Sequence, residues 1–353
     1  MAPELNIDLD HTVAFLVDLL NTPSPTGYHV EAIPFVRDAF AALDIADMEI
    51  SETRKGALLI KVPGQSSDAP IGLTAHTDTL GFMVKEIKSN GRLALTRLGG
   101  ILWGSVESEG VTVRTHENRR IRGSIVPHNT SVHVNSKIAS ADRDGNLMEV
   151  RLDEVTSNAQ GTRDLGIAVG DFVFVDPKVE LSESGFIRSR FLDDKAGVAC
   201  IYGALAAIKA ADLVPPQDIY VLIANYEEVG HGGSNGLPDT LAELLAVDMG
   251  AIGRGQAGDE FSVSICVKDG GGPYHFDMNN KLRRLAEAFD IAHNIDIYVY
   301  YASDGTAFWR SGGDAKVGLA GPGVDGSHAY ERTHRDSILH TTHLLARYML
   351  DEG

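Results

Sequence analysis

Five short motifs in the sequence carry histidines and carboxylates that could bind metal ions. Their residues are His76, Asp78, Asp193, Asp194, Glu227, Glu228, Asp248 and His328. Taken singly, each has an ordinary explanation, since an Asp-Asp pair that opens a helix is usually a cap and a lone His-x-Asp is usually a surface pair. Most of them, however, lie next to predicted buried strands, and ligands of open α/β sheets bind outside the carboxyl ends of the strands. Several carboxylates at one such edge would repel strongly unless cations neutralised them. The joint pattern therefore predicts a cation site.

The ligand types indicate which cations to expect. Imidazole and carboxylate without thiolate suit Zn²⁺ best, with Co²⁺ or Mn²⁺ as substitutes, better than Ca²⁺ or Mg²⁺. Two histidines and three carboxylates are too many for one tetrahedral ion, but they fit two ions that share a bridging carboxylate at ~3.5–4 Å. One further carboxylate must stay off the ions to take a proton from water. Because Glu227 and Glu228 point in different directions, one can bind while the other acts as the base, and Asp78 is well placed to orient His76.

Elements that could position these groups can be read from hydrophobic periodicity. Strands are predicted at Ile71–Ala75, Ile219–Ala224, Leu244–Val247 and Ile295–Tyr301, and helices at Lys195–Ala211 and Ile338–Leu350. Between residues 81 and 184 the sequence changes to short runs in which apolar and polar residues alternate. Turn-forming residues separate these runs, which is typical of a small all-β module. We therefore expect a three-layer α/β catalytic domain with a mixed, mostly parallel sheet, formed by residues 1–83 and 185–353 and interrupted by a β-rich domain at 84–184.

Composition excludes several classes of protein. The formal net charge of −18 disfavours nucleic acid as a partner, because a chain this acidic repels phosphate backbones. The two cysteines, Cys200 and Cys266, lie in apolar stretches and are expected to be buried thiols rather than a thiol-rich metal site or a disulfide framework. The N-terminus lacks the pattern of a signal peptide, and no apolar run reaches the ~20 residues of a membrane span. We expect a cytoplasmic protein that does not bind membranes.

These motifs together resemble a known family, the dinuclear metallo-aminopeptidases of the glutamyl aminopeptidase and tetrahedral aminopeptidase type. The matching strings are Ala75–Asp78 with Gly81–Val84, Gly170–Val173, Leu192–Val198, Glu227–Gly230, Ala246–Asp248 and Ser303–Thr306. They occur in the expected order and span nearly the whole chain. The resemblance implies a zinc-exopeptidase-like catalytic domain interrupted by a PDZ-like domain that helps to build homo-oligomers. These are dimer-based and often dodecameric.

The resemblance also implies a role for each residue. His76 would bind one ion, Asp193 would bridge both, and Glu228 and Asp248 would be further ligands. Glu227 would be the general base. By the same comparison Asp78 would orient His76, and Asp194 would help to fix the turn.

The last ligand is left open between two histidines, because the chain departs from the family pattern there. His328 lies at about the expected distance before the closing helix and is favoured, whereas His334 lies almost against the helix cap. Two other departures are Thr79 in place of an acidic residue and His231 directly after the Glu-Glu-Val-Gly string. The same tail resembles a subgroup associated with a glutamine-derived dipeptide osmolyte, which implies a small modified peptide as substrate.

The expected function is removal of N-terminal residues from short peptides by a metal-activated water. An amidohydrolase or deacylase acting on an N-acylated, peptide-like metabolite would have the same metal core, so the motifs do not separate the two. A non-catalytic scaffold is disfavoured because every candidate position carries a chemically competent residue. A serine hydrolase is disfavoured because the sequence has no Gly-x-Ser-x-Gly nucleophile motif.

Overall fold

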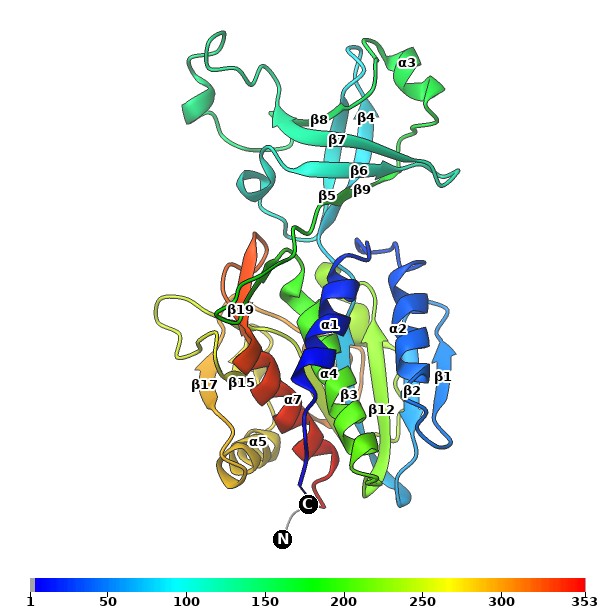
Figure 1. The fold of residues 1–353 in the computed structure, drawn as a ribbon, viewed down its shortest axis with the longest axis vertical. Helices are drawn as coiled ribbons and strands as arrows, with labels where there is room; N and C mark the ends of the chain where they lie inside the picture. The colour runs from blue at the N-terminus through cyan, green and yellow to red at the C-terminus, as the bar shows by residue number, and fades with distance from the viewer. Residues whose placement is uncertain (1–3, 353) are drawn as a thin grey trace. The chain divides into compact units, whose positions relative to one another are not determined.

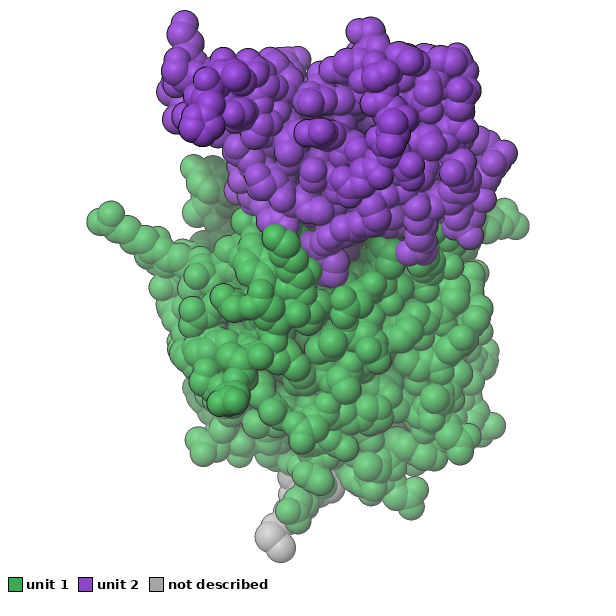
Figure 2. All heavy atoms as spheres, turned by 45° about the horizontal axis from the view of Figure 1, so that its top comes forward, with its two compact units in different colours: residues 1–78, 178–353 green, residues 79–177 purple. Residues whose placement is uncertain are grey.

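The computed structural model describes residues 4–352 and divides the chain into two compact units. Unit 1 comprises residues 1–78 and 178–353, and unit 2 comprises residues 79–177, as coloured in Figure 2. The candidate metal ligands all belong to unit 1. Whether the segment predicted at 84–184 acts as an oligomerisation domain stays a prediction.

Unit 1 is built on a ten-stranded mixed sheet. Its path runs β1 (Glu49–Glu52), β2 (Leu58–Val62), β12 (Gln217–Ala224), β3 (Ser66–His76), β13 (Glu243–Val247), β18 (Lys316–Val324), β15 (Val263–Asp269) and β16 (Gly272–Pro273), with β14 (Gly250–Ala251) beside β18 and β17 (His293–Ile297) beside β15. The four central strands β12, β3, β13 and β18 run parallel to one another. The carboxyl ends of these four strands therefore meet at one edge of the sheet.

These central strands form because their sequences are almost continuously apolar. In β12 the stretch Val221–Ala224 is fully buried, and in β3 residues 70–76 are buried without alternation. A strand buried on both faces reads as a continuous apolar run rather than an alternating one. The strands predicted at Ile71–Ala75, Ile219–Ala224 and Leu244–Val247 are thus confirmed as parts of β3, β12 and β13.

Helices cover the sheet. They are α1 (Leu9–Leu20), α2 (Ala32–Ala41), α4 (Leu192–Ala210), α5 (Phe276–Ala288), α6 (Asp304–Arg310) and α7 (Arg335–Met349). The long helices α4 and α7 pack against each other on one face of the sheet (Figure 1). The α1 helix begins at the Asp8 cap, whose carboxylate accepts the His11 N–H.

Shorter elements lie near the carboxyl edge of the sheet. The 3₁₀ helices η3 (Glu227–Val229) and η4 (Gly232–Ser234) follow β12 directly. A separate three-stranded sheet contains β10 (Glu180–Leu181), β11 (Phe186–Ser189) and β19 (Glu331–His334). The β19 strand returns the chain to α7, so the loop between β18 and β19 lies beyond the end of β18.

Unit 2 is a small closed barrel, with strand order β4 (Gly81–Ile87), β5 (Leu93–Leu98), β8 (Met148–Leu152), β7 (Arg120–Pro127), β6 (Gly110–Arg114) and β9 (Phe172–Val175). Its short helices are η1 (Trp103–Val106), η2 (Ile138–Ser140) and α3 (Ala159–Asp164). The β-rich texture predicted for this part of the chain is confirmed, whereas a PDZ-like identity stays a prediction. Trp103 packs within the barrel, with its ring 4.9 Å from that of Phe82.

One predicted strand is shorter in the structure, and the two cysteines are as predicted. The strand predicted at Ile295–Tyr301 is wrong at its end, because β17 ends at Ile297, and Val299 and Tyr300 are exposed. The cysteines Cys200 and Cys266 are buried free thiols, as predicted. Among the described residues, no helix is long and apolar enough to cross a membrane.

Candidate metal centre

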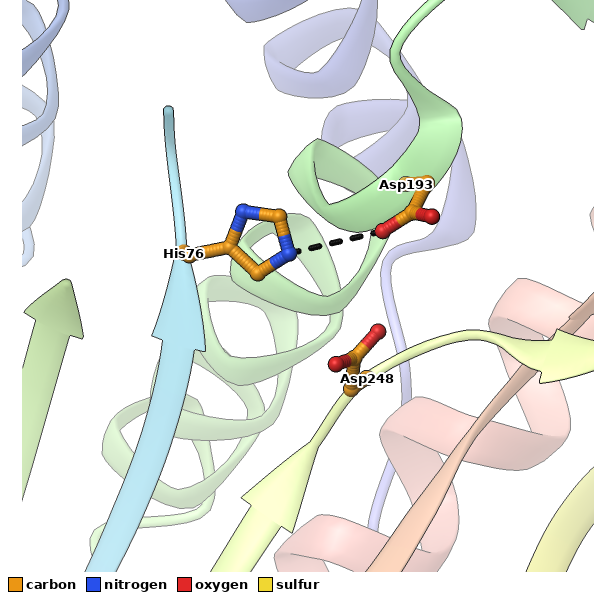
Figure 3. A group of neighbouring side chains, drawn as sticks. All are labelled: His76, Asp193 and Asp248. Carbon is orange, nitrogen blue, oxygen red and sulfur yellow. Dashed lines mark ion pairs between the residues drawn. The ribbon is translucent and has the colours of Figure 1, made fainter. Parts of the chain in front are cut away.

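The predicted ligands converge at the carboxyl edge of the central sheet. His76 is the last residue of β3, Asp248 follows β13 directly, and Asp193 lies at the start of α4 (Figure 3). Glu227 and Glu228 lie in η3 just beyond β12, and His328 lies in the loop after β18. These side chains are far apart in the sequence, and the four parallel strands bring them together.

Two overlapping triads have the spacing of metal ligands. His76, Asp193 and Asp248 form one, and Asp193, Glu228 and His328 form the other, with the candidate ligand atoms of each group within 4.8 Å of one another. Asp193 belongs to both groups and presents one oxygen to each. Its Oδ1 lies 3.4 Å from His76 Nε2, and its Oδ2 lies 3.7 Å from His328 Nε2. This is the arrangement expected of a bridging carboxylate.

His76 is prepared to bind a cation. Its Nδ1 lies 2.9 Å from the carbonyl oxygen of Asp78, so this nitrogen carries the proton and the lone pair is on Nε2. The Nε2 atom is buried and has no hydrogen-bond partner. A buried nitrogen of this kind, aimed at carboxylates, fits a divalent metal ion and has no structural role of its own.

The electrostatics of the cluster also fit bound cations. Burial, together with the charge of Asp193, raises the pKa of Asp248 to about 7 and raises that of Glu228 well above its usual range. Burial acts to raise the pKa of Asp193 too, but the neighbouring imidazoles of His76 and His328 outweigh that effect, and its pKa is lowered. Without a cation, the cluster therefore holds protons that a divalent ion would displace.

Glu227 lies beside the triads but belongs to neither. Its Oε2 is 3.6 Å from His76 Nε2. Burial and the charge of Asp248 raise its pKa well above the usual range of a glutamate. A carboxylate with a raised pKa is suited to take a proton and release it again.

Asp78 holds the backbone of the Glu-Glu pair. Its Oδ1 accepts the N–H of Glu227 at 3.1 Å, and its Oδ2 accepts the N–H of Glu228 at 3.3 Å and the hydroxyl of Thr26 at 2.7 Å. The carboxylate is 3.7 Å from His76 Nδ1, so the ring is held by the Asp78 carbonyl and only more distantly by its side chain. The predicted link between Asp78 and His76 is thus made mainly through the backbone.

Asp194 belongs to neither of the two ligand groups. It accepts the backbone N–H groups of His76 at 3.3 Å and of Gly197 at 3.2 Å. The carboxylate therefore ties the end of β3 to the first turn of α4.

Of the two histidines left open by the sequence, His328 lies at the cluster. Its Nε2 is 3.6 Å from Glu228 Oε2. His334 uses both ring nitrogens elsewhere, because Nε2 lies 2.8 Å from the Ser184 carbonyl and Nδ1 accepts the N–H of Asp336 at the start of α7. The geometry favours His328 as the ligand.

Several residues at the site had no assigned role in the sequence analysis. Ser327 donates its hydroxyl to Asp193 Oδ2 at 2.9 Å, and Glu331 accepts the backbone N–H of Asp193 at 3.1 Å. Asp304 accepts the N–H of Gly233, just beyond η3. Asp304 lies in a motif that supported the resemblance, and Ser327 directly precedes the candidate ligand His328, whereas Glu331 was assigned no role by any motif.

Comparison with known proteins agrees with the geometry. A family described as M42 glutamyl aminopeptidase matches residues 56–344. The curated Bacillus subtilis (strain 168) protein named "Putative aminopeptidase YhfE" is 46% identical over 338 residues, covering 96% of this chain and 97% of that protein.

Solved structures show the same fold. An aminopeptidase from the archaeon Desulfurococcus kamchatkensis has a TM-score of 0.86 at 19% identity and covers 97% of this chain and 95% of its own. The Pyrococcus horikoshii TET1 peptidase is described as able to assemble into a tetrahedron or a large octahedral shell. It has a TM-score of 0.79 at 19% identity, and the match covers 96% of this chain and 99% of that chain.

Proposed function

The chain belongs to the M42 glutamyl aminopeptidase family, and from that membership we propose that it is a metal-dependent aminopeptidase that uses two divalent ions. The observation that carries the proposal is the pair of ligand triads that share Asp193. His76 and Asp248 would complete one ion site, and Glu228 and His328 the other. Zn²⁺ is the proposed metal, with Co²⁺ or Mn²⁺ as substitutes, because the donors are imidazole and carboxylate.

When bound, such ions lower the pKa of water and polarise the scissile carbonyl. The residues of the chain supply the proton transfers. Glu227 takes the proton of the attacking water and then passes it to the nitrogen of the leaving amine. Asp78 keeps Glu227 in place by accepting its backbone N–H. No side chain forms a covalent intermediate in this scheme.

The substrate proposal is a short peptide with a free N-terminal amine. Support comes from the family and from the aminopeptidase names of the relatives. The acidic character of the chain, with a net charge of −18, favours a cationic amine over an anionic substrate. A deacylase of N-acylated metabolites and a peptidase of small modified dipeptides would share the same metal core.

One experiment tests this proposal. The purified protein is stripped with a chelator, reloaded with Zn²⁺ or Co²⁺, and analysed for metal content and for hydrolysis of matched dipeptides with free and N-acetylated amines. We expect two ions per chain and cleavage of the free-amine substrates. Turnover of only the acetylated series would establish the deacylase instead, and a fully active protein without metal would refute metal dependence.

We also propose that the protein forms a homo-oligomer in the cytoplasm, in which unit 2 serves as the PDZ-like assembly module. The support is the TET1 peptidase, whose assembly into closed shells is described for that protein. Light scattering of the full chain tests the assembly, and cell fractionation tests the location.

A further inference from the structure

Glu331 is a buried carboxylate that the proposed mechanism does not use. It is the first residue of β19 and is only 2% exposed. Its Oε2 accepts the backbone N–H of Asp193 at 3.1 Å, and its Oε1 accepts the backbone N–H of His328 at 3.2 Å. One side chain thus joins the start of α4 to the loop between β18 and β19.

Both connected residues belong to the same ligand triad. Asp193 and His328, with Glu228, form the second of the two groups. Asp193 is 138 residues from Glu331 in the sequence, so no local structure fixes its distance to His328. The shared carboxylate sets that distance directly.

The backbone at His328 needs such support. Its φ is 65°, in the left-handed region that residues with a side chain adopt at a cost in energy. A hydrogen bond from its N–H to Glu331 offsets part of that cost. The imidazole is 38% exposed, so packing around the side chain does little to hold it.

The chemistry of the bond requires a carboxylate. Each of the two oxygens of a carboxyl group can accept a hydrogen bond, whereas a glutamine would turn an NH₂ donor toward one of the two N–H groups.

We propose that Glu331 is a positioning residue that sets the geometry of the second cation site by tying the backbones of Asp193 and His328 together. This inference rests on the proposed two-ion function. The first site depends less on Glu331, because His76 and Asp248 are carried by β3 and β13. Loss of the Glu331 carboxylate should therefore weaken one ion more than the other.

The test compares wild-type protein with Glu331→Gln after removal of metal. Each is titrated with Co²⁺, followed by its visible absorption, and with Zn²⁺ in a calorimeter. We expect two ions per chain in the wild type. In Glu331→Gln we expect one of the two ions to lose affinity about 10- to 100-fold, with the affinity for the other ion nearly unchanged. Excess metal should restore turnover.

A matched control separates positioning from general stability. Glu260 is a half-buried carboxylate that pairs with Arg332, next to Glu331 in the chain, at 2.8 Å. Glu260→Gln removes an ion pair from the same region but touches neither triad. We expect it to bind both ions with wild-type affinity, even if both variants lose a similar amount of thermal stability when metal-free.

The outcomes distinguish failure of the inference about Glu331 from failure of the proposed function. Two ions bound by Glu331→Gln with unchanged affinities would overturn the inference and leave the proposed function intact, whereas a wild type that binds no ions would refute the two-ion function itself. If Glu331→Gln does not fold, the test uses the metal-free wild type instead, and amide hydrogen exchange is measured at the backbone N–H groups of Asp193 and His328. Slow exchange at Asp193 and His328 would support the inference, and exchange at the rate of open loops would overturn it.

Discussion

At the scale of single residues, the centre is organised by backbone hydrogen bonds as much as by ligand side chains. Asp78, Asp194 and Glu331 are each buried carboxylates that accept backbone N–H groups from segments that carry candidate ligands. A carboxylate that makes such bonds fixes the backbone from which a ligand side chain extends. Groups that do not touch the metal themselves orient metal ligands in this way.

The neighbouring glutamates should respond differently to the same substitution. Glu227→Gln should lower kcat by about 10²- to 10⁴-fold, because a proton acceptor is lost, while two ions remain bound and KM changes little. Glu228→Gln should instead weaken the binding of one ion. Steady-state kinetics combined with metal analysis of both variants checks the assignment, and near-normal turnover of Glu227→Gln would exclude it as the base.

Residue types and motifs were enough to predict most of the cluster. His76, Asp193 and Glu228 lie in motifs beside strands or at the start of a helix, and the structure brings all three together. The sequence favoured His328 but left His334 open, because the hydrogen bonds of His334 to Ser184 and Asp336 depend on tertiary structure. Glu331 escaped notice for the same reason, since its partners are backbone groups far away in the chain.

At the scale of elements, the start of α4 is the most constrained point of the site. The turn before the helix includes non-helical dihedral angles at Asp193 and Asp194. The glycine that follows in the first turn has no room for a side chain, because a Cβ on Gly197 would lie 2.4 Å from Asp194 Oδ1. A close approach of carboxylate and backbone here requires glycine.

We therefore expect Gly197→Ala to destabilise the protein by about 1–3 kcal/mol, as overpacking does, and to displace the Asp194 carboxylate from the His76 N–H. Gly161→Ala in α3 is the matched control, because its nearest contacts lie at 3.8 Å, an ordinary distance. Urea denaturation of the metal-free proteins measures both. Equal stability of the two variants would show that the turn can relax around a methyl group.

Hydrophobic periodicity predicted elements well where burial was uniform, as in β12 and β13. It failed at the edge of the sheet, where the apolar run from Ile295 to Tyr301 continues past the end of β17. Part of that run packs into the interior without forming a strand. Tyr298 is buried, and Tyr301 donates its hydroxyl to the Met249 carbonyl near the site. Apolar character alone does not distinguish these uses.

At the scale of the whole molecule, the acidic cluster should link stability to pH and to metal. Burial and the charge of Asp193 raise the pKa of Asp248 to about 7, and burial raises that of Asp304 to about 6. Both values exceed the roughly 3.9 of an aspartate in an unfolded chain. The metal-free native state therefore binds more protons than the unfolded state between about pH 4 and pH 7, and its free energy of unfolding falls as the pH rises through that window.

Metal should reverse this trend. Since ligands bind ions in their deprotonated form, the stabilisation by Zn²⁺ should grow as the pH rises over the same range. Thermal unfolding with chelator and with Zn²⁺ at several pH values checks both signs. Asp248→Asn serves as the control, because its metal-free form should lose less stability as the pH rises. If the free energy of unfolding of this variant falls with pH as steeply as that of the wild type, Asp248 does not cause the pH dependence.

The family, the mixed α/β sheet and the β-rich insert could all be predicted from the sequence, because they depend on motifs and on local texture. The closure of the insert into a barrel could not, because closure depends on the pairing of β4 with β9, whose sequences lie far apart.

The chain leaves unit 1 after Asp78 and returns to it at Lys178. Every side chain discussed for hydrolysis lies outside the intervening segment. Natural selection can therefore alter, lengthen or exchange that segment without rebuilding the chemistry. Two relatives that differ throughout this segment can therefore keep the same set of side chains for the reaction.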